Sequence, residues 1–162
     1  MSTRSHILIE QEKNQLYPIM IYKHSDGYPS GVLPFLQEFT HKFLKVRGHD
    51  PEYFLAQLLR HWSIQDRWYE AIIKTAWGRD DYEEPYEGFN ERHKNIQSEY
   101  AFLSWGITPL SDIHGDIEYF YIVKTTGKIE VRVPKKGFWE NPTLENTKKM
   151  TVAEVKKALT DE

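Results

Sequence analysis

Apolar residues gather in two short runs near the start of the chain, at residues 6–10 and 16–23. Both runs are rich in β-branched and aromatic side chains, and a polar stretch separates them, so we expect them to pair as a β-hairpin. Residues 25–31 read Ser-Asp-Gly-Tyr-Pro-Ser-Gly, a composition typical of turns that cannot continue a strand. We therefore predict a tight loop after the second strand, with Gly27 at a positive φ.

The period of the apolar residues changes after this loop. From Val32 they recur every three or four positions, which predicts a helix in which Pro34 is compatible only with the first turn. A second helix is predicted to begin at Pro51, with Asp50 as its N-cap. The helical spacing extends as far as Ala76 unless the helix breaks earlier.

Three further strands are predicted in the second half of the chain, at residues 100–105, 117–124 and 128–134. The middle one has apolar residues on both faces, so we expect it at the centre of a sheet. Thr125-Thr126-Gly127 joins the last two strands and predicts a second hairpin.

The end of the chain completes the predicted architecture. Residues 135–149 are interpreted as a linker, and Thr151-Val152-Ala153-Glu154 matches the capping box that opens a short terminal helix. The order ββααβββα predicts an α+β fold with an antiparallel sheet of about five strands and helices packed on one face. We expect one domain over residues 1–162, in which residues 135–162 form the linker and the C-terminal helix.

Composition excludes several classes of protein. The 162 residues include 21 basic and 24 acidic ones and no cysteine, which excludes a disulfide scaffold, an iron–sulfur cluster and a cysteine nucleophile. No apolar run is long enough for a membrane span, and residues 1–11 lack the apolar stretch of a signal peptide. The sequence contains no run of basic residues, which argues against duplex nucleic acid as the main ligand. We therefore expect a cytoplasmic protein.

Two motifs at the start of the chain resemble known sequences. They are Met1-Ser2-Thr3-Arg4-Ser5 and the turn His24-Ser25-Asp26-Gly27-Tyr28-Pro29. Together they resemble small uncharacterised phage and bacterial proteins, over about the first forty residues. In that group the residue after the histidine is often aromatic, whereas this chain has Ser25. The resemblance implies a phage setting, in the host cytoplasm, and a shared loop, but no reaction.

The turn also predicts a ligand cradle on physical grounds. Glycines let backbone N–H groups approach an anion, basic side chains supply charge, and tyrosine can stack on a base. We therefore hypothesise a non-catalytic protein that binds a small anionic ligand, a host immune nucleotide being one candidate, and that self-associates into a homo-oligomer. No cofactor or metal is needed. The candidate ligand-binding residues are Arg4, Lys23, His24, Asp26, Gly27 and Tyr28.

Two other functions stay open at the level of the sequence. One is a metal- or histidine-dependent phosphodiesterase or related hydrolase that uses His24 with His114 or His61 as acid and base. The segment Asp112-Ile113-His114-Gly115-Asp116 places metal-ligand types at alternate positions, although a turn explains it as well. Removal of Met1 would also expose Ser2 as an N-terminal nucleophile, but the chain has too few strands for that fold.

The remaining alternative is an inhibitor that binds another protein. Residues 80–91 combine six carboxylates with aromatic side chains, a pattern that suits a basic partner. Such a run is more often a solvated loop. The common enzyme motifs for nucleotides, zinc proteases and serine hydrolases are absent from the sequence.

Overall fold

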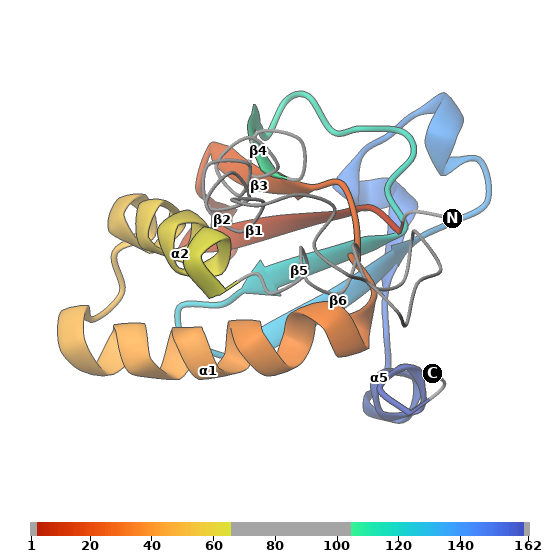
Figure 1. Cartoon of the computed structure of the whole chain (residues 1–162). Coiled ribbons are helices and arrows are strands. Elements are labelled where there is room, and N and C mark those ends of the chain that lie inside the picture. Colours follow the sequence, from red (N-terminus) through yellow and green to blue (C-terminus); the bar gives the residue numbers. More distant parts are fainter. Residues whose placement is uncertain (1–2, 66–104, 161–162) are drawn as a thin grey trace, which may run out of the picture.

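The computed structural model describes residues 3–65 and 105–160, which form an α+β fold (Figure 1). Its three α-helices are α1 (Pro29–Arg47), α2 (Pro51–Gln65) and α5 (Val152–Ala158). Two short 3-10 turns, η1 (Phe138–Glu140) and η2 (Leu144–Asn146), precede the last strand. The strands are β1 (Ser5–Glu12), β2 (Gln15–Leu16), β3 (Ile19–Lys23), β4 (Trp105–Pro109), β5 (Tyr119–Val123), β6 (Ile129–Pro134) and β7 (Thr147–Lys149).

The described strands form one open, mostly antiparallel sheet in the order β4-β3-β1-β5-β6-β7, with β2 paired to β1. The predicted α+β class is confirmed, but the order and the number of strands differ from the prediction. The main difference is that β1 and β5 pair in parallel, with Ser5 opposite Tyr119 and Ile9 opposite Val123. Parallel neighbours need a long crossover, and the segment that contains α1 and α2 separates these two strands in the sequence.

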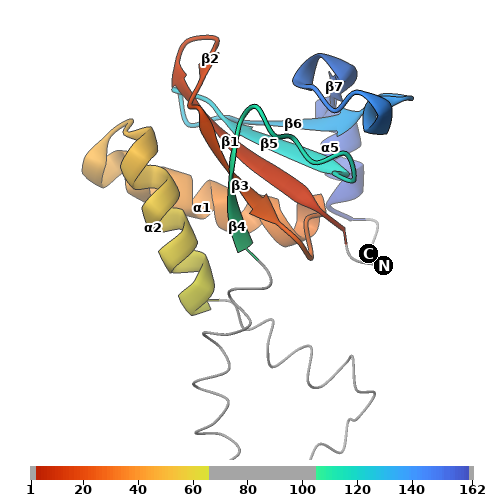
Figure 2. The same ribbon diagram turned by 90° about the horizontal axis from the view of Figure 1, so that it is seen from above.

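Alternation along the strands gives the sheet two different apolar faces. One face packs against α1 and α2; in Figure 1, α1 lies below the sheet and α2 at its left side. The other is covered by the segment after β4 and by residues 134–149, as the view in Figure 2 also shows. The first core includes Ile7, Ile9, Ile21, Leu36, Leu58 and Tyr121, and the second includes Leu8, Met20, Phe120, Ile122 and Phe138.

Helix α1 begins earlier than the apolar period predicted. Pro29 occupies the first turn, where a missing N–H is tolerated, and Tyr28 is the N-cap without a side-chain cap bond. Pro34 therefore lies inside the helix, not in its first turn, and the prediction for Pro34 was wrong. The prediction for the next helix is confirmed, because the carboxylate of Asp50 accepts a hydrogen bond from the N–H of Tyr53 at 3.4 Å.

The second half of the sheet follows local sequence signals closely. Strand β5 lies between β1 and β6, as predicted, and the β5–β6 hairpin turns at Gly127 with φ 83°. Residues 135–149, expected as a linker, contain η1, η2 and β7, and β7 pairs with β6. Thr151 and Glu154 form the predicted capping box of α5.

Some expectations fall on residues outside the described ranges. They are the extension of the second helix to Ala76, the strand residues 100–104 and the acidic segment 80–91. Among the residues that the structure describes, no helix is long and apolar enough to cross a membrane.

Candidate functional site

The turn predicted as a ligand cradle lies against the start of the chain. The N–H of Gly27 donates to the carbonyl oxygen of Thr3 at 2.9 Å, and its own carbonyl accepts from the hydroxyl of Tyr121 at 2.7 Å. A Cβ at Gly27 would come within 2.9 Å of the Arg4 backbone, so close approach requires glycine here. Asp26, not Gly27, has the positive φ, at 51°, which corrects the prediction.

The two predicted cations of this cradle lie on opposite faces of the sheet. The guanidinium of Arg4 forms an ion pair with the carboxylate of Asp116 at 3.0 Å. Lys23 is 4% exposed, and its ammonium lies 4.6 Å from the ring centroid of Trp105. Since Tyr22 and Lys23 are consecutive in a strand, they face opposite ways, and Tyr22 is the residue on the side of Arg4. The structure therefore does not bring Arg4 and Lys23 to one anion.

Tyr22 connects two of the histidines considered for acid–base chemistry. Its hydroxyl lies 2.9 Å from Nδ1 of His24, and its ring lies 4.4 Å, centroid to centroid, from that of His114. Burial and the charge of Asp116 raise the pKa of Tyr22, while Arg4 opposes the rise. The phenol thus stays protonated at neutral pH. His61, the other candidate, contacts Phe35 and Phe39 on the helical face.

Sequence reasoning missed His6, which holds this cluster in place. His6 is fully buried opposite Tyr22, and its Nδ1 lies 3.3 Å from the carbonyl oxygen of Ile21. Its Nε2 accepts a hydrogen bond from the backbone N–H of His114 at 3.3 Å. A carbonyl only accepts, so Nδ1 carries the proton and the ring is neutral. Burial, reinforced by His114 and opposed by the Ile21 carbonyl, lowers the pKa of His6 from 6.5 to about 4.

The predicted alternation of Asp112, His114 and Asp116 does not gather three ligands. Within residues 3–65 and 105–160, no group of three or more histidine and carboxylate side chains is arranged to hold a metal ion. Asp116 instead pairs with Arg4, and the backbone of His114 bonds to His6. This cluster is therefore a set of imidazole, phenol and guanidinium groups around one loop.

A second candidate site is a hollow between the sheet, α1 and α5, which we call the basic hollow. It has a volume of about 790 Å³, within the range of roughly 300–1,000 Å³ found for small-molecule sites. Its polar lining residues are Glu10, Lys13, Asn14, Gln37, Lys124, Thr125, Thr126, Lys128, Glu130, Lys149 and Lys156. Its apolar lining residues are Leu33, Ile129, Val131, Met150, Val152, Val155 and Leu159.

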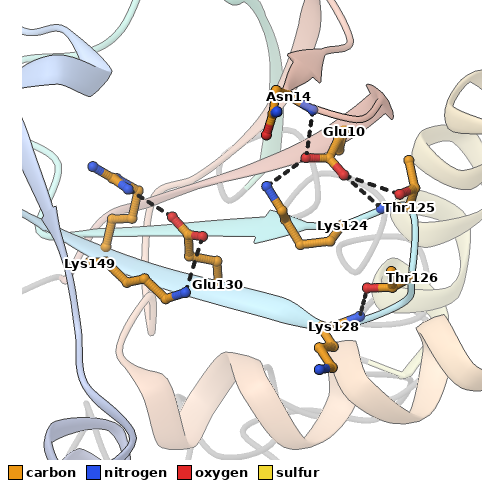
Figure 3. A network of polar contacts seen from close by, with 9 residues as sticks. Glu10, Asn14, Lys124, Thr125, Thr126, Lys128, Glu130 and Lys149 are labelled. Atoms are coloured by element: carbon orange, nitrogen blue, oxygen red, sulfur yellow. Dashed lines mark hydrogen bonds and ion pairs between the residues drawn. The ribbon is translucent and has the colours of Figure 1, made fainter.

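A buried carboxylate at the end of β1 organises one wall of the basic hollow (Figure 3). Glu10 is 3% exposed and lies 2.5 Å from the ammonium of Lys124. Its carboxylate also accepts hydrogen bonds from the N–H and hydroxyl of Thr125, at 3.1 and 3.2 Å, and from the N–H of Asn14 at 3.3 Å. The bond from Lys124 is the main reason why the pKa of Glu10 falls to about 2, against the opposing effect of burial. Glu10 is therefore ionised, and the ammonium of Lys124 balances its negative charge.

The other carboxylate of the hollow is neutralised in the same way. Burial alone would raise the pKa of Glu130, but a 2.7 Å bond from Arg132 and the nearby Lys149, at 3.5 Å, hold it below its usual value. Lys13, Lys128 and Lys156 make no ion pair with any residue that the structure describes.

The charge of the lining differs in sign from that of the whole chain. Five lysines and two glutamates line the basic hollow, a balance of +3, whereas the chain carries −3. Sequence reasoning missed this site because its residues come from four separated segments, 10–14, 33–37, 124–131 and 149–159. A signal was present, since residues 124–162 contain nine basic residues and six acidic ones in an otherwise acidic chain.

Comparison with protein-family models, with curated proteins and with solved structures finds no match to this chain. The cluster around Tyr22 offers proton donors and acceptors, and the basic hollow offers volume, positive charge and apolar surface.

Proposed function

We propose that this protein binds a small anionic ligand in the basic hollow and releases it unchanged. The observation that carries the proposal is the excess of lysines around a hollow large enough for a small molecule. The two carboxylates there are already neutralised by internal partners, so an entering anion meets a net positive wall. Three ammonium groups without an ion pair in the described part of the chain supply the attraction.

The lining of the basic hollow supports binding without catalysis. No histidine lines it, so the usual general acid or base is missing from its described walls. Glu10, with a pKa of about 2, is too weak a base to take a proton from a substrate near neutral pH. The lysines attract the anion through their charge.

The proposal keeps the class of ligand that the sequence indicated and moves its site. More positive charge is available to an anion, including the nucleotide suggested by the phage resemblance, at the basic hollow than at the turn of Gly27. Arg4 is paired with Asp116, and Lys23 is buried on the other face. Sequestration of a host signal and self-association stay predictions that follow from this function.

A panel of anions tests the proposal. Purified protein is mixed with inorganic phosphate, linear and cyclic nucleotides, and short- and long-chain carboxylates, and both the melting temperature and the recovered compound are measured. A bound anion must raise the melting temperature and be recovered intact. The shift should shrink with added salt and in the double variant K128Q/K156Q. If no anion shifts the melting temperature, or if the double variant responds like the wild type, the proposal fails.

A second candidate function is favoured by the position of Tyr22 between His24 and His114. Here the protein is a histidine-dependent phosphodiesterase, in which one imidazole takes a proton from the attacking water and the other protonates the leaving oxygen. The phenol of Tyr22 links the two rings. Arg4 supplies a positive charge at the same end of the sheet.

Turnover of bis(4-nitrophenyl) phosphate tests this second candidate. Release of 4-nitrophenol should fall at least tenfold in both His24→Gln and His114→Gln, because a general acid or base contributes about 100-fold or more. His61→Gln is the control, since that ring lies on the helical face. Activity that survives both substitutions, or no activity in the wild type, excludes the hydrolase.

A further inference from the structure

The lining of the basic hollow indicates the apolar part of the ligand as well as its charge. Its apolar residues are all aliphatic or Met, and no aromatic ring is among the described residues that line it. A nucleobase usually stacks on an aromatic side chain or an arginine plane, and neither is among the described residues of the lining. The apolar surface instead suits a flexible hydrocarbon chain, which needs contact area and no stacking partner.

Part of this apolar surface is exposed to water. Val152 is 73% exposed and Leu159 is 37% exposed, and both line the hollow from the side of α5. Helix α5 has no fully buried residue, so it contributes its apolar side to the hollow without closing it. A hydrocarbon chain lying between α5 and β6 would cover these side chains, and their removal from water would favour binding.

The charged residues of the lining come largely from the same segments as its apolar residues. Lys128 directly precedes β6, and Lys156 lies on α5. We call Leu33 on α1 and Ile129 and Val131 on β6, three of the apolar lining residues, the aliphatic floor. At the β5–β6 turn the lining is polar, with Glu10 bonded to Lys124 and Thr125 and with Lys128 on the same turn, as Figure 3 shows. An ammonium is a compact point charge that suits a single anionic headgroup.

We infer that the ligand of the basic hollow is a long-chain aliphatic acid, with its carboxylate beside Lys128 and Lys156 and its chain along the aliphatic floor. This inference rests on the proposed function and narrows it. The evidence is the combination of three lysines without an ion pair among the described residues, apolar lining residues that are all aliphatic or Met, and exposed apolar side chains at α5.

A chain-length series tests the inference on the intact protein. Affinities for acetate, octanoate, decanoate and dodecanoate are measured by titration calorimetry, below the concentrations at which the longer acids form micelles. Each methylene that enters the hollow should tighten binding by about fourfold. Dodecanol tests the headgroup, because it keeps the chain and loses the charge, and it should bind at least about tenfold more weakly than dodecanoate.

Two neighbouring lysines of α5 provide a matched pair of variants. Lys156 lines the basic hollow and Lys157 does not, although both are exposed and lie in the last turn of the same helix. Lys156→Gln and Lys128→Gln should each weaken dodecanoate binding about three- to tenfold. Lys157→Gln should leave it within about twofold.

The outcomes separate this inference from the function on which it rests. Lysine-dependent binding of phosphate or a nucleotide, with no gain along the carboxylate series, would overturn the aliphatic acid and keep an anion-binding hollow. Binding of dodecanoate that is equal in Lys156→Gln and Lys157→Gln would overturn both. If no anion binds, both are overturned. If affinity rises steeply with the chain length of the carboxylate and falls in Lys156→Gln, both are supported.

Discussion

Strand β1 buries two ionisable side chains four residues apart, His6 and Glu10. It keeps His6 neutral and Glu10 ionised. His6 is fully buried and neutral, because both of its ring nitrogens are used and burial lowers its pKa to about 4. Glu10 is 3% exposed and ionised, because Lys124 and three hydrogen bonds lower its pKa to about 2. The exposed fractions of the two side chains are similar, and Glu10 differs in having the counter-charge of Lys124, which keeps it ionised.

The two ends of β1 also serve different parts of the molecule. The neutral end fixes the backbone of His114 against Tyr22, so it positions a loop. The ionised end fixes Lys124 and the turn at Thr125 on the wall of the basic hollow. Nε2 of His6 can accept the N–H of His114 only while the ring is neutral, whereas protonation of Glu10 removes the negative charge that pairs with Lys124. Acid should therefore loosen both ends, in different pH ranges.

The largest expected effect is the pH dependence that comes from His6. Its folded pKa of about 4 lies below the unfolded value of 6.5. The stability that it contributes is therefore complete above pH 6.5 and is lost as the pH falls toward 4. The loss amounts to about 3 kcal/mol in the free energy of unfolding. Urea unfolding between pH 7 and pH 4 measures it.

His6→Gln shows whether this loss belongs to His6. The variant cannot titrate, so the fall between pH 6.5 and pH 4 should flatten, whereas His41→Gln, at an exposed site on α1, should keep it. An unchanged fall in His6→Gln would mean that His6 is not held neutral in the folded protein.

The next largest effect is expected at the ionised end, from Lys124→Met. Removal of the ammonium leaves the buried carboxylate of Glu10 with hydrogen bonds but no counter-charge. Losing one partner of a fully buried pair costs about 3–5 kcal/mol, and Lys124 is 31% exposed, so we expect about 2 kcal/mol at pH 7. Urea unfolding checks the value, and Lys128→Met, which breaks no ion pair, should cost far less.

The pH dependence of the same variant gives a second check. The pKa of Glu10 is lowered from 4.5, so its contribution is present above pH 4.5 and is lost as the pH falls toward 2. The difference between wild type and Lys124→Met should therefore narrow over that range. A difference that stays constant would show that the lysine acts through packing and not through charge.

The features predicted correctly from the sequence are those set by neighbours in the chain. Gly127 in the β5–β6 hairpin, the capping box from Thr151 to Glu154 and Asp50 at the start of α2 all depend on residues within a few positions. Local chemistry of this kind can be read without knowing the rest of the fold.

The features that were missed depend on distant pairing. The parallel register of Ser5 with Tyr119 spans most of the chain, and the basic hollow joins Glu10 to Thr125 and to α5. The predicted cradle failed to unite Arg4 and Lys23 because side chains on a strand alternate, and the sequence did not show on which face each cation would lie.

A smaller effect is expected from Thr125→Val, which tests the hydrogen bonds of Glu10 without touching its counter-charge. The variant keeps the backbone N–H and removes the hydroxyl that lies 3.2 Å from the carboxylate. Loss of one such bond should cost about 1 kcal/mol in the free energy of unfolding. Thr126→Val is the matched control, since that side chain is exposed and does not contact Glu10. If the two variants lose the same free energy of unfolding, the hydroxyl of Thr125 does not contribute to the hydrogen bonds of Glu10.

The smallest stability effect is expected for Arg4→Gln, and it separates the two ends of β1 as ligand sites. The ion pair with Asp116 joins side chains that are 32% and 53% exposed, so its loss should cost less than about 0.5 kcal/mol. The folded protein can therefore be titrated with the anion that binds the wild type. Unchanged affinity in Arg4→Gln and weaker affinity in Lys156→Gln would place the ligand at the ionised end, in the basic hollow. The reverse pattern would return it to the turn of Gly27, where the sequence first predicted it.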